Sequence, residues 1–183
     1  MNNSKINFMR RNAEISIDGV YRYSLIREWW SSPKEKIKWI CFCGLNPSIA
    51  DEKIDDPTIG REIGFAQSLG ANALIKVNIY AYRATDPKKL INFINENGLL
   101  MAYGKKNTEA IKNAVKLARS NTGKGVYAAW GDIPKNIKPS KFIINLFGKP
   151  LMCLGTSINN SPRHPLYLPK IACPQEWKNI DYI

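Results

Sequence analysis

Histidine and cysteine are scarce in this chain, and neither is arranged as a metal site requires. One of the 183 residues is histidine and four are cysteine. Zinc and iron–sulfur sites usually place their ligands on loops with C-x-x-C-like spacing, whereas Cys41 and Cys43 lie within an apolar run. Buried free thiols are the expected state of such residues. We therefore expect no metal, no other cofactor and no disulfide framework.

Acidic residues are also few relative to basic ones. Fifteen Asp and Glu stand against 27 Lys and Arg, which gives a formal net charge of +12. An excess of this kind favours an anionic partner, and nucleic acid is the usual one. The basic residues are dispersed along the chain, so a lysine-rich, solubilising surface would give the same count.

The chain has no apolar run long enough to cross a bilayer, and its N-terminus lacks the apolar region of a signal peptide. We therefore expect a cytoplasmic protein without membrane contacts. The length is ordinary for one globular domain, and we find no internal repeat, low-complexity tract or linker. The expectation is a single domain spanning residues 1–183, acting as a monomer.

Short apolar runs alternate with helical patterns along most of the chain. Alternation around Asp18-Gly19 predicts an N-terminal hairpin. Strands are expected at 37–44, 73–82, 125–131 and 151–155, and helices at 56–70, 85–94, 107–119 and 139–148. Asp56-Pro57 and Asp86-Pro87 are typical helix starts, Asn107 or Thr108 opens the third helix, and Gly70 and Gly148 are stops.

This order predicts an α/β fold, with three α/β/α layers around a central four-stranded, mainly parallel sheet. The expected segments are a flexible stretch (1–12), a hairpin (13–30), the α/β core (37–155) and a C-terminal loop and tail (156–183). In such sheets ligands bind beyond the carboxyl ends of the strands. We therefore expect Asn46-Pro47-Ser48, Asn78, Trp130-Gly131 and the loop after Gly155 to share one rim. That loop holds the single histidine, His164.

Two resemblances follow from these residues. Over most of its length, the chain resembles an uncharacterised bacterial and phage family through "GLNPSIADEKIDDPT", "YRATDP", "AWG" and "RHPLYLP". A strand ending in Gly-Leu-Asn-Pro, a later strand ending in Asn and a final His-Pro loop also resemble the uracil-DNA glycosylase superfamily, in the same order. Its single-strand-selective and mismatch-specific branches carry Gly-x-Asn-Pro.

The second resemblance implies catalytic roles for Asn46 and His164. Asn46 would hold the water that attacks the sugar C1′, although Asn in place of Asp implies slower chemistry. His164 would donate a hydrogen bond to the departing base, where negative charge develops. Asn78 would read the edge of a base flipped out of the stack. Superfamily members act without a metal, which agrees with the expectation above.

The resemblance also implies a substrate-binding set: Gly44, Leu45, Pro47, Ser48, Asn78, Arg83, Arg163, Pro165, Leu166 and Tyr167. Ser48 stands where the uracil-specific branch has Tyr, so we expect weak discrimination against 5-substituted pyrimidines. Arg83 and Arg163 are candidate phosphate contacts. Leu166 or Tyr167 would fill the stack after base flipping. The superfamily continues His-Pro-Ser, whereas this chain reads His-Pro-Leu, which leaves the details of this loop open.

Three aspartates follow the Asn-Pro turn. Asp56 is expected to cap a helix, and Asp51 and Asp55 could serve as acid or base near the sugar or be structural. The leading hypothesis is a DNA glycosylase-like hydrolase that cleaves the N-glycosidic bond of a deaminated or modified base in single- or double-stranded DNA. One alternative is a hydrolase of a free nucleotide or nucleoside derivative. Another is a nucleic-acid-binding protein without catalysis.

Overall fold

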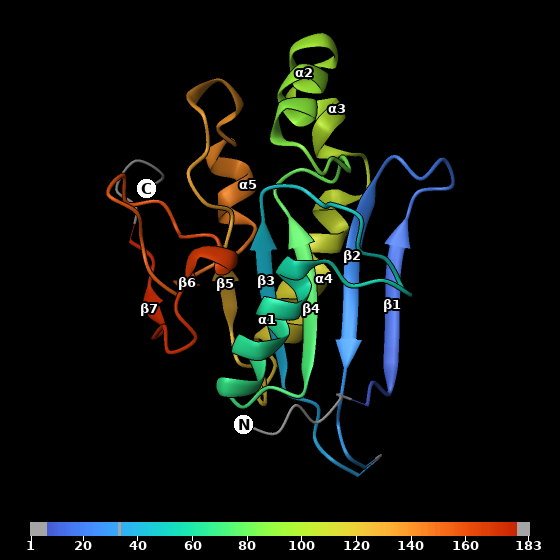
Figure 1. The fold of residues 1–183 in the computed structure, drawn as a ribbon, viewed down its shortest axis with the longest axis vertical. Helices are drawn as coiled ribbons and strands as arrows, with labels where there is room; N and C mark the ends of the chain where they lie inside the picture. Colours follow the sequence, from blue (N-terminus) through green and yellow to red (C-terminus); the bar gives the residue numbers. More distant parts are fainter. Residues whose placement is uncertain (1–6, 33, 179–183) are drawn as a thin grey trace.

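The computed structural model of the protein describes residues 7–32 and 34–178. They are built around one mixed, seven-stranded sheet with the strand order β1-β2-β4-β3-β5-β6-β7 (Figure 1). The strands are β1 (Arg10–Ile15), β2 (Arg22–Glu28), β3 (Trp39–Gly44), β4 (Ala73–Asn78), β5 (Val126–Ala128), β6 (Met152–Cys153) and β7 (Gln175–Glu176).

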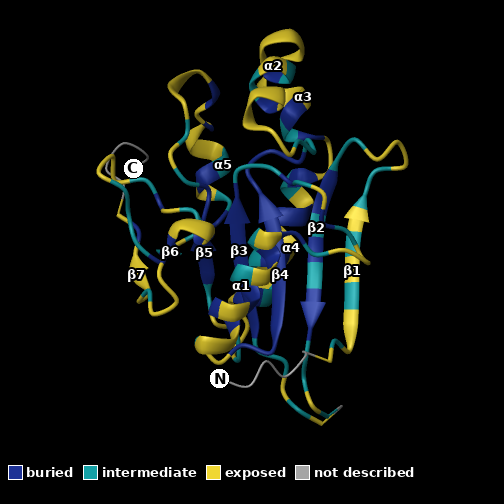
Figure 2. Cartoon of the chain, in the orientation of Figure 1, coloured by how far each residue is buried: buried dark blue, intermediate teal, exposed yellow. Residues whose placement is uncertain are grey.

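The middle of the sheet is the parallel core that the sequence predicts. β3 pairs in parallel with β4 and with β5, and β5 pairs in parallel with β6. All residues of β3, β4 and β5 are buried, and Figure 2 shows these strands in dark blue. A parallel strand covered on both faces carries apolar side chains at successive positions. This explains why these strands appear in the sequence as continuous apolar runs and not as an alternation of apolar and polar residues.

The sheet has seven strands, however, and not the four expected. β2 of the N-terminal hairpin pairs antiparallel with β4, and β7 pairs antiparallel with β6. Each added strand satisfies backbone groups that an exposed edge of the parallel core would leave unpaired. β1 begins at Arg10, within the stretch 1–12 that was expected to precede the hairpin. Residues 1–6 and 179–183 of the predicted terminal segments lie outside the described residues.

The helices begin largely where the sequence signals placed them. They are α1 (Pro57–Ser68), α2 (Pro87–Asn97), α3 (Leu99–Tyr103), α4 (Asn107–Ala118) and α5 (Lys141–Asn145), with 3-10 turns η1 (Lys135–Ile137) and η2 (Pro165–Tyr167). The Asp56 carboxylate accepts a hydrogen bond from Ile59 N at 2.9 Å, and Asp86 accepts one from Lys88 N at 2.8 Å. Both predicted caps are therefore confirmed.

α4 begins at Asn107, one of the two predicted first residues, and Asn107 makes no capping hydrogen bond. Its buried side chain donates to the carbonyls of Asn78 and Ile79, at 3.1 and 3.0 Å. The amide thus fastens α4 to the carboxyl end of β4. α3 was not predicted, because five residues are too few to show a helical period.

The two faces of the sheet have separate cores. Ile40, Phe42 and Leu74 pack with α1 on one face, and Cys41, Cys43 and Ile75 pack with α4 on the other. Figure 1 shows α1 in front of the strands and α4 behind them. Cys41, Cys43 and Cys153 are buried free thiols, as expected, whereas Cys173 is free and exposed. Burial raises the pKa of the Cys41 thiol to about 12.

Among residues 7–32 and 34–178, no helix combines the length and the apolar character needed to pass through a bilayer. Within the same residues, no three His, Cys, Asp or Glu side chains group together as ligands of a metal ion would.

Candidate functional site

A cavity of about 590 Å³ opens at the carboxyl ends of the parallel strands. Its volume falls in the range of small-molecule sites, about 300–1,000 Å³. Its walls come from the ends of β3 and β5, the start of α1, the 84–91 segment and the loop that carries His164. The predicted site residues that line it are Gly44, Leu45, Asn46, Ser48, Asp56, His164, Leu166 and Tyr167.

The side chain of Asn46 has a defined orientation in this cavity. Its Nδ2 donates to the carbonyl of Ala84 at 2.7 Å and to the carbonyl of Pro47 at 3.1 Å. Carbonyl oxygens only accept hydrogen bonds, so these partners require the nitrogen of the amide on their side. Both amide hydrogens are thereby used, and Oδ1 is left as an acceptor for a ligand or a water.

His164 is 118 positions from Asn46 in the sequence but lies on the wall of the same cavity. Its Nδ1 faces the backbone N–H of Leu166 at 3.4 Å, at the start of η2. Burial lowers the pKa of His164 to about 4, with the charge of Lys76 adding to this effect and that of Asp56 opposing it. The imidazole is therefore neutral at pH 7. With Nδ1 as acceptor, the proton resides on Nε2, which can donate a hydrogen bond.

The His164 loop is fastened to α1 by Arg61. The guanidinium donates to the carbonyls of Pro165, at 3.4 Å, and Leu168. It also lies over the ring of Phe65, with 4.9 Å between Cζ and the ring centroid. Arg61 is thus a positioning residue for the loop, and sequence analysis did not assign it this role.

A buried polar cluster forms the floor of the cavity, and sequence analysis did not predict it. Lys76 and Arg22 line the floor, and Lys76 Nζ forms an ion pair with Glu62 of α1. Arg22 Nη1 donates to the carbonyl of Ala50 at 2.8 Å. All three charged side chains are almost completely buried. Charged groups are seldom fully buried unless they are paired, so this floor is chemically unusual.

Weak signals of the cluster exist in the sequence. Lys76 interrupts the apolar run "ALIKVN", and Glu62 shares the helical spacing of Ile59 and Ile63, which are buried. Arg22 has no comparable signal. A bulge in β2, where Glu14 pairs with Ser24 and Ile15 pairs with Arg22, changes the local alternation.

Asn78 is buried beside this cluster but does not line the cavity. Neither its Oδ1 nor its Nδ2 has a hydrogen-bond partner among the described residues. A Cβ atom at Gly44 would lie 2.8 Å from Asn78 Oδ1 and 2.9 Å from Lys76 Nζ. Glycine at position 44 therefore makes room for both polar side chains at the end of β3.

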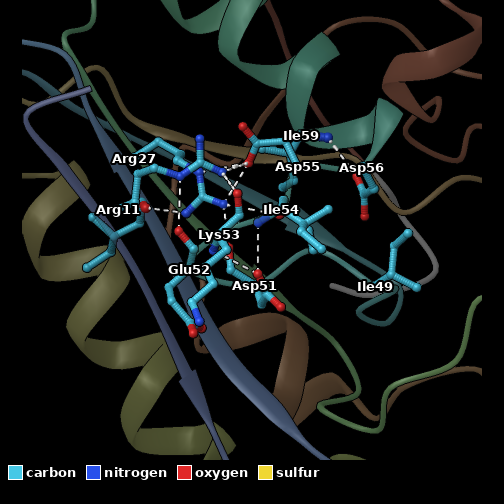
Figure 3. Close-up of polar contacts among 12 residues, drawn as sticks. Arg11, Arg27, Ile49, Asp51, Glu52, Lys53, Ile54, Asp55, Asp56 and Ile59 are labelled. Atoms are coloured by element: carbon cyan, nitrogen blue, oxygen red, sulfur yellow. Dashed lines mark hydrogen bonds and ion pairs between the residues drawn. The ribbon is translucent and has the colours of Figure 1, made fainter. Parts of the chain in front are cut away.

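The aspartates of the loop before α1 have structural contacts (Figure 3). The Asp51 carboxylate accepts from the backbone N–H groups of Lys53 and Ile54, at 2.7 and 2.8 Å, and these bonds lower its pKa. Asp55 forms ion pairs with Arg27 and Arg11, at 2.6 and 3.2 Å. Neither aspartate lines the cavity. Asp56 does so while it caps α1.

The two arginines predicted to contact phosphate are engaged with main-chain carbonyls. Arg83 donates to the carbonyls of Gly19, Ser48 and Ile49, at 3.2–3.4 Å. Arg163 donates to the carbonyl of Tyr167 at 2.9 Å. Neither of these predicted phosphate contacts lines the cavity, and neither do Pro47 and Pro165.

Comparison with known proteins identifies one family. The model of a protein family of unknown function, DUF1643, matches residues 22–166. The chain belongs to this family. The matched segment includes the Asn46 turn, the floor residues and His164. No curated protein and no solved structure matches the chain, so the resemblance to uracil-DNA glycosylases remains a hypothesis within DUF1643.

Proposed function

We propose that this DUF1643 protein is a glycosylase-like hydrolase that cleaves the N-glycosidic bond of a deaminated or modified base in DNA. The observation that carries the proposal is that Asn46 and His164, 118 positions apart, line one cavity of small-molecule size. Each presents the hydrogen-bonding atom that the reaction needs.

The chemistry requires a positioned water and a stabilised leaving base. Glycosidic cleavage passes through an oxocarbenium-like transition state. Asn46 Oδ1, left free by the two bonds of Nδ2, accepts a hydrogen bond from the attacking water. Neutral His164 donates from Nε2 to the base, where negative charge develops.

DNA as the substrate is supported by charge and by the cavity rim. The net charge of +12 attracts a polyanion. Leu166 and Tyr167, 42% and 74% exposed, stand at the rim of the cavity on the η2 turn. An apolar side chain at this place fills the space that a flipped base leaves in the stack.

One observation favours a free nucleotide or nucleoside as a second candidate substrate. The guanidiniums of Arg83 and Arg163 are engaged with main-chain carbonyls, so two predicted backbone contacts are already occupied. A small substrate needs only the cavity and does not need a long phosphate-binding surface.

The deciding experiment measures base release from single- and double-stranded oligonucleotides that carry a panel of deaminated and modified bases, together with the matching free nucleosides. Asn46→Ala and His164→Ala are expected to lower the rate at least about 100-fold, as loss of a transition-state hydrogen bond does. Asn113→Ala, an exposed position on α4, is the matched control.

Release from nucleosides and not from DNA would select the second candidate. If neither class of substrate loses its base, the hydrolase proposal is wrong. Salt-dependent DNA binding that both cavity variants retain would then indicate a non-catalytic nucleic-acid-binding protein.

A further inference from the structure

The ion pair on the cavity floor is not explained by stability alone. Lys76 and Glu62 are 3% and 0% exposed, and burial raises the pKa of Glu62. Taking two charges out of water costs several kcal/mol each, and replacing such a pair by apolar residues is often neutral or stabilising. A charged pair beside a ligand cavity is therefore a candidate for chemistry.

The cluster has hydrogen-bonding capacity that the described residues leave unused. Glu62 Oε2 and Arg22 Nε are buried without a partner among the described residues. Buried polar atoms are nearly always paired, so unpaired ones call for a ligand or a water. Lys76 Nζ has three donors, of which its ion pair with Glu62 uses one. It also lies beside Gly44, two residues before Asn46.

The neutral state of His164 leaves one step without a proton source. Its pKa of about 4 means that the imidazole can donate a hydrogen bond but carries no additional proton at pH 7. Burial lowers the pKa of the Arg22 guanidinium to about 10, and its Nη1 already donates to the carbonyl of Ala50. Of the floor residues, Lys76 lines the cavity and keeps N–H donors beyond the one that its ion pair with Glu62 uses.

We propose that Lys76 is a catalytic acid that protonates the departing base, with Glu62 positioning it. This inference rests on the proposed hydrolase function. The bond between C1′ and the base nitrogen breaks, and its electron pair goes to the base. The base takes a proton from Lys76 Nζ. Water adds its hydroxyl to C1′, and the remaining water proton returns to the Lys76 amine.

The test measures how the rate of base release depends on the stability of the departing base as an anion. Two otherwise identical oligonucleotides carry uracil or 5-fluorouracil, whose fluorine stabilises the departing anion and reduces its need for a proton. Loss of a general acid costs about 10²–10⁴-fold. We expect Lys76→Met to lower the rate of uracil release at least about 100-fold. The factor by which it lowers the rate of 5-fluorouracil release should be smaller by at least about tenfold. Asn46→Ala should lose equally on both, since it acts on water.

A second variant guards against misfolding. Lys76→Met leaves Glu62 unpaired in the core, whereas the double variant Lys76→Met/Glu62→Leu fills the same space with apolar groups and removes both charges. The double variant is expected to keep the thermal midpoint within a few degrees and to show the same leaving-base selectivity as Lys76→Met. Lys112→Met, on the exposed side of α4, is the matched control and should behave as wild type.

Equal losses on uracil and 5-fluorouracil in both Lys76 variants would overturn the inference while the hydrolase proposal stands. Unchanged rates in the folded double variant would do the same. If the wild-type protein releases neither pyrimidine, the inference is overturned, and release of other bases in the panel would still support the hydrolase function.

Discussion

Arg27 should contribute more to stability than any other side chain that contacts the loop before α1, and Arg27→Met tests this. The side chain is completely buried and pairs with Asp55 through Nε, at 2.8 Å, and through Nη2, at 2.6 Å. Nη2 also donates to the carbonyls of Asp51 and Ile54. Methionine keeps much of the apolar stem and removes every one of these bonds.

The expected loss follows from what remains after the substitution. Removing one partner of a buried ion pair costs about 3–5 kcal/mol. Asp55 is 24% exposed and keeps its second partner, Arg11, which places the cost at the lower end. The freed carbonyls belong to residues that reach solvent, so water compensates them in part. We expect the free energy of unfolding to fall by about 3 kcal/mol.

Urea denaturation measures this change, with Arg11→Met as the matched control. Arg11 binds the same carboxylate and two carbonyls of the same loop, those of Glu52 and Lys53. Its side chain is 27% exposed, and exposed ion pairs contribute at most about 1 kcal/mol. If the two substitutions lower the free energy of unfolding equally, burial is not what makes the Arg27 contacts strong, and the reasoning is refuted.

Three further outcomes are expected. Because the folded pKa of His164, about 4, is below its ordinary value of 6.5, the unfolded chain binds the proton first, and stability is lost as pH falls from 6.5 towards 4. The urea midpoint should therefore fall more between pH 7 and pH 5 in wild type than in His164→Gln. Equal falls in the two proteins would contradict this. Gly44→Ala should cost about 2 kcal/mol through overpacking against Lys76 and Asn78, whereas Gly64→Ala, with open space around it, should stabilise α1 in the same denaturation assay. Ser48→Tyr should narrow the cavity and reduce release of 5-substituted pyrimidines relative to unsubstituted ones, and an unaltered substrate range would disprove this model of the cavity.

Local chemistry made much of the architecture predictable. Asp56-Pro57 and Asp86-Pro87 start helices because a carboxylate that accepts an N-terminal N–H and a ring that presets φ act within a few residues. Continuous apolar runs marked the parallel strands because both faces of each strand are covered. The placement of Asn46 and His164 on one cavity followed from the rule that strand carboxyl ends gather ligand sites.

The roles of Asp51 and Asp55 were not predictable in this way. The nearest arginine to Asp55 along the chain is Arg61, whereas Asp55 pairs with Arg27 of β2 and Arg11 of β1. These partners lie 28 and 44 positions away. They meet Asp55 only because the hairpin joins the sheet beside β4, an edge pairing that no local signal specifies.

The sequence by itself therefore determined the helix starts, the parallel core and several of the residues after the strand ends that line the cavity, since each depends on neighbours along the chain. Tertiary structure alone decided that the sheet has seven strands, that a β2 bulge sends Arg22 to the cavity floor, and that Lys76 meets Glu62 there. A charged residue in an apolar run stays ambiguous until its partner is known. That partner comes from another element, and only the packing of α1 on the sheet brings the two together.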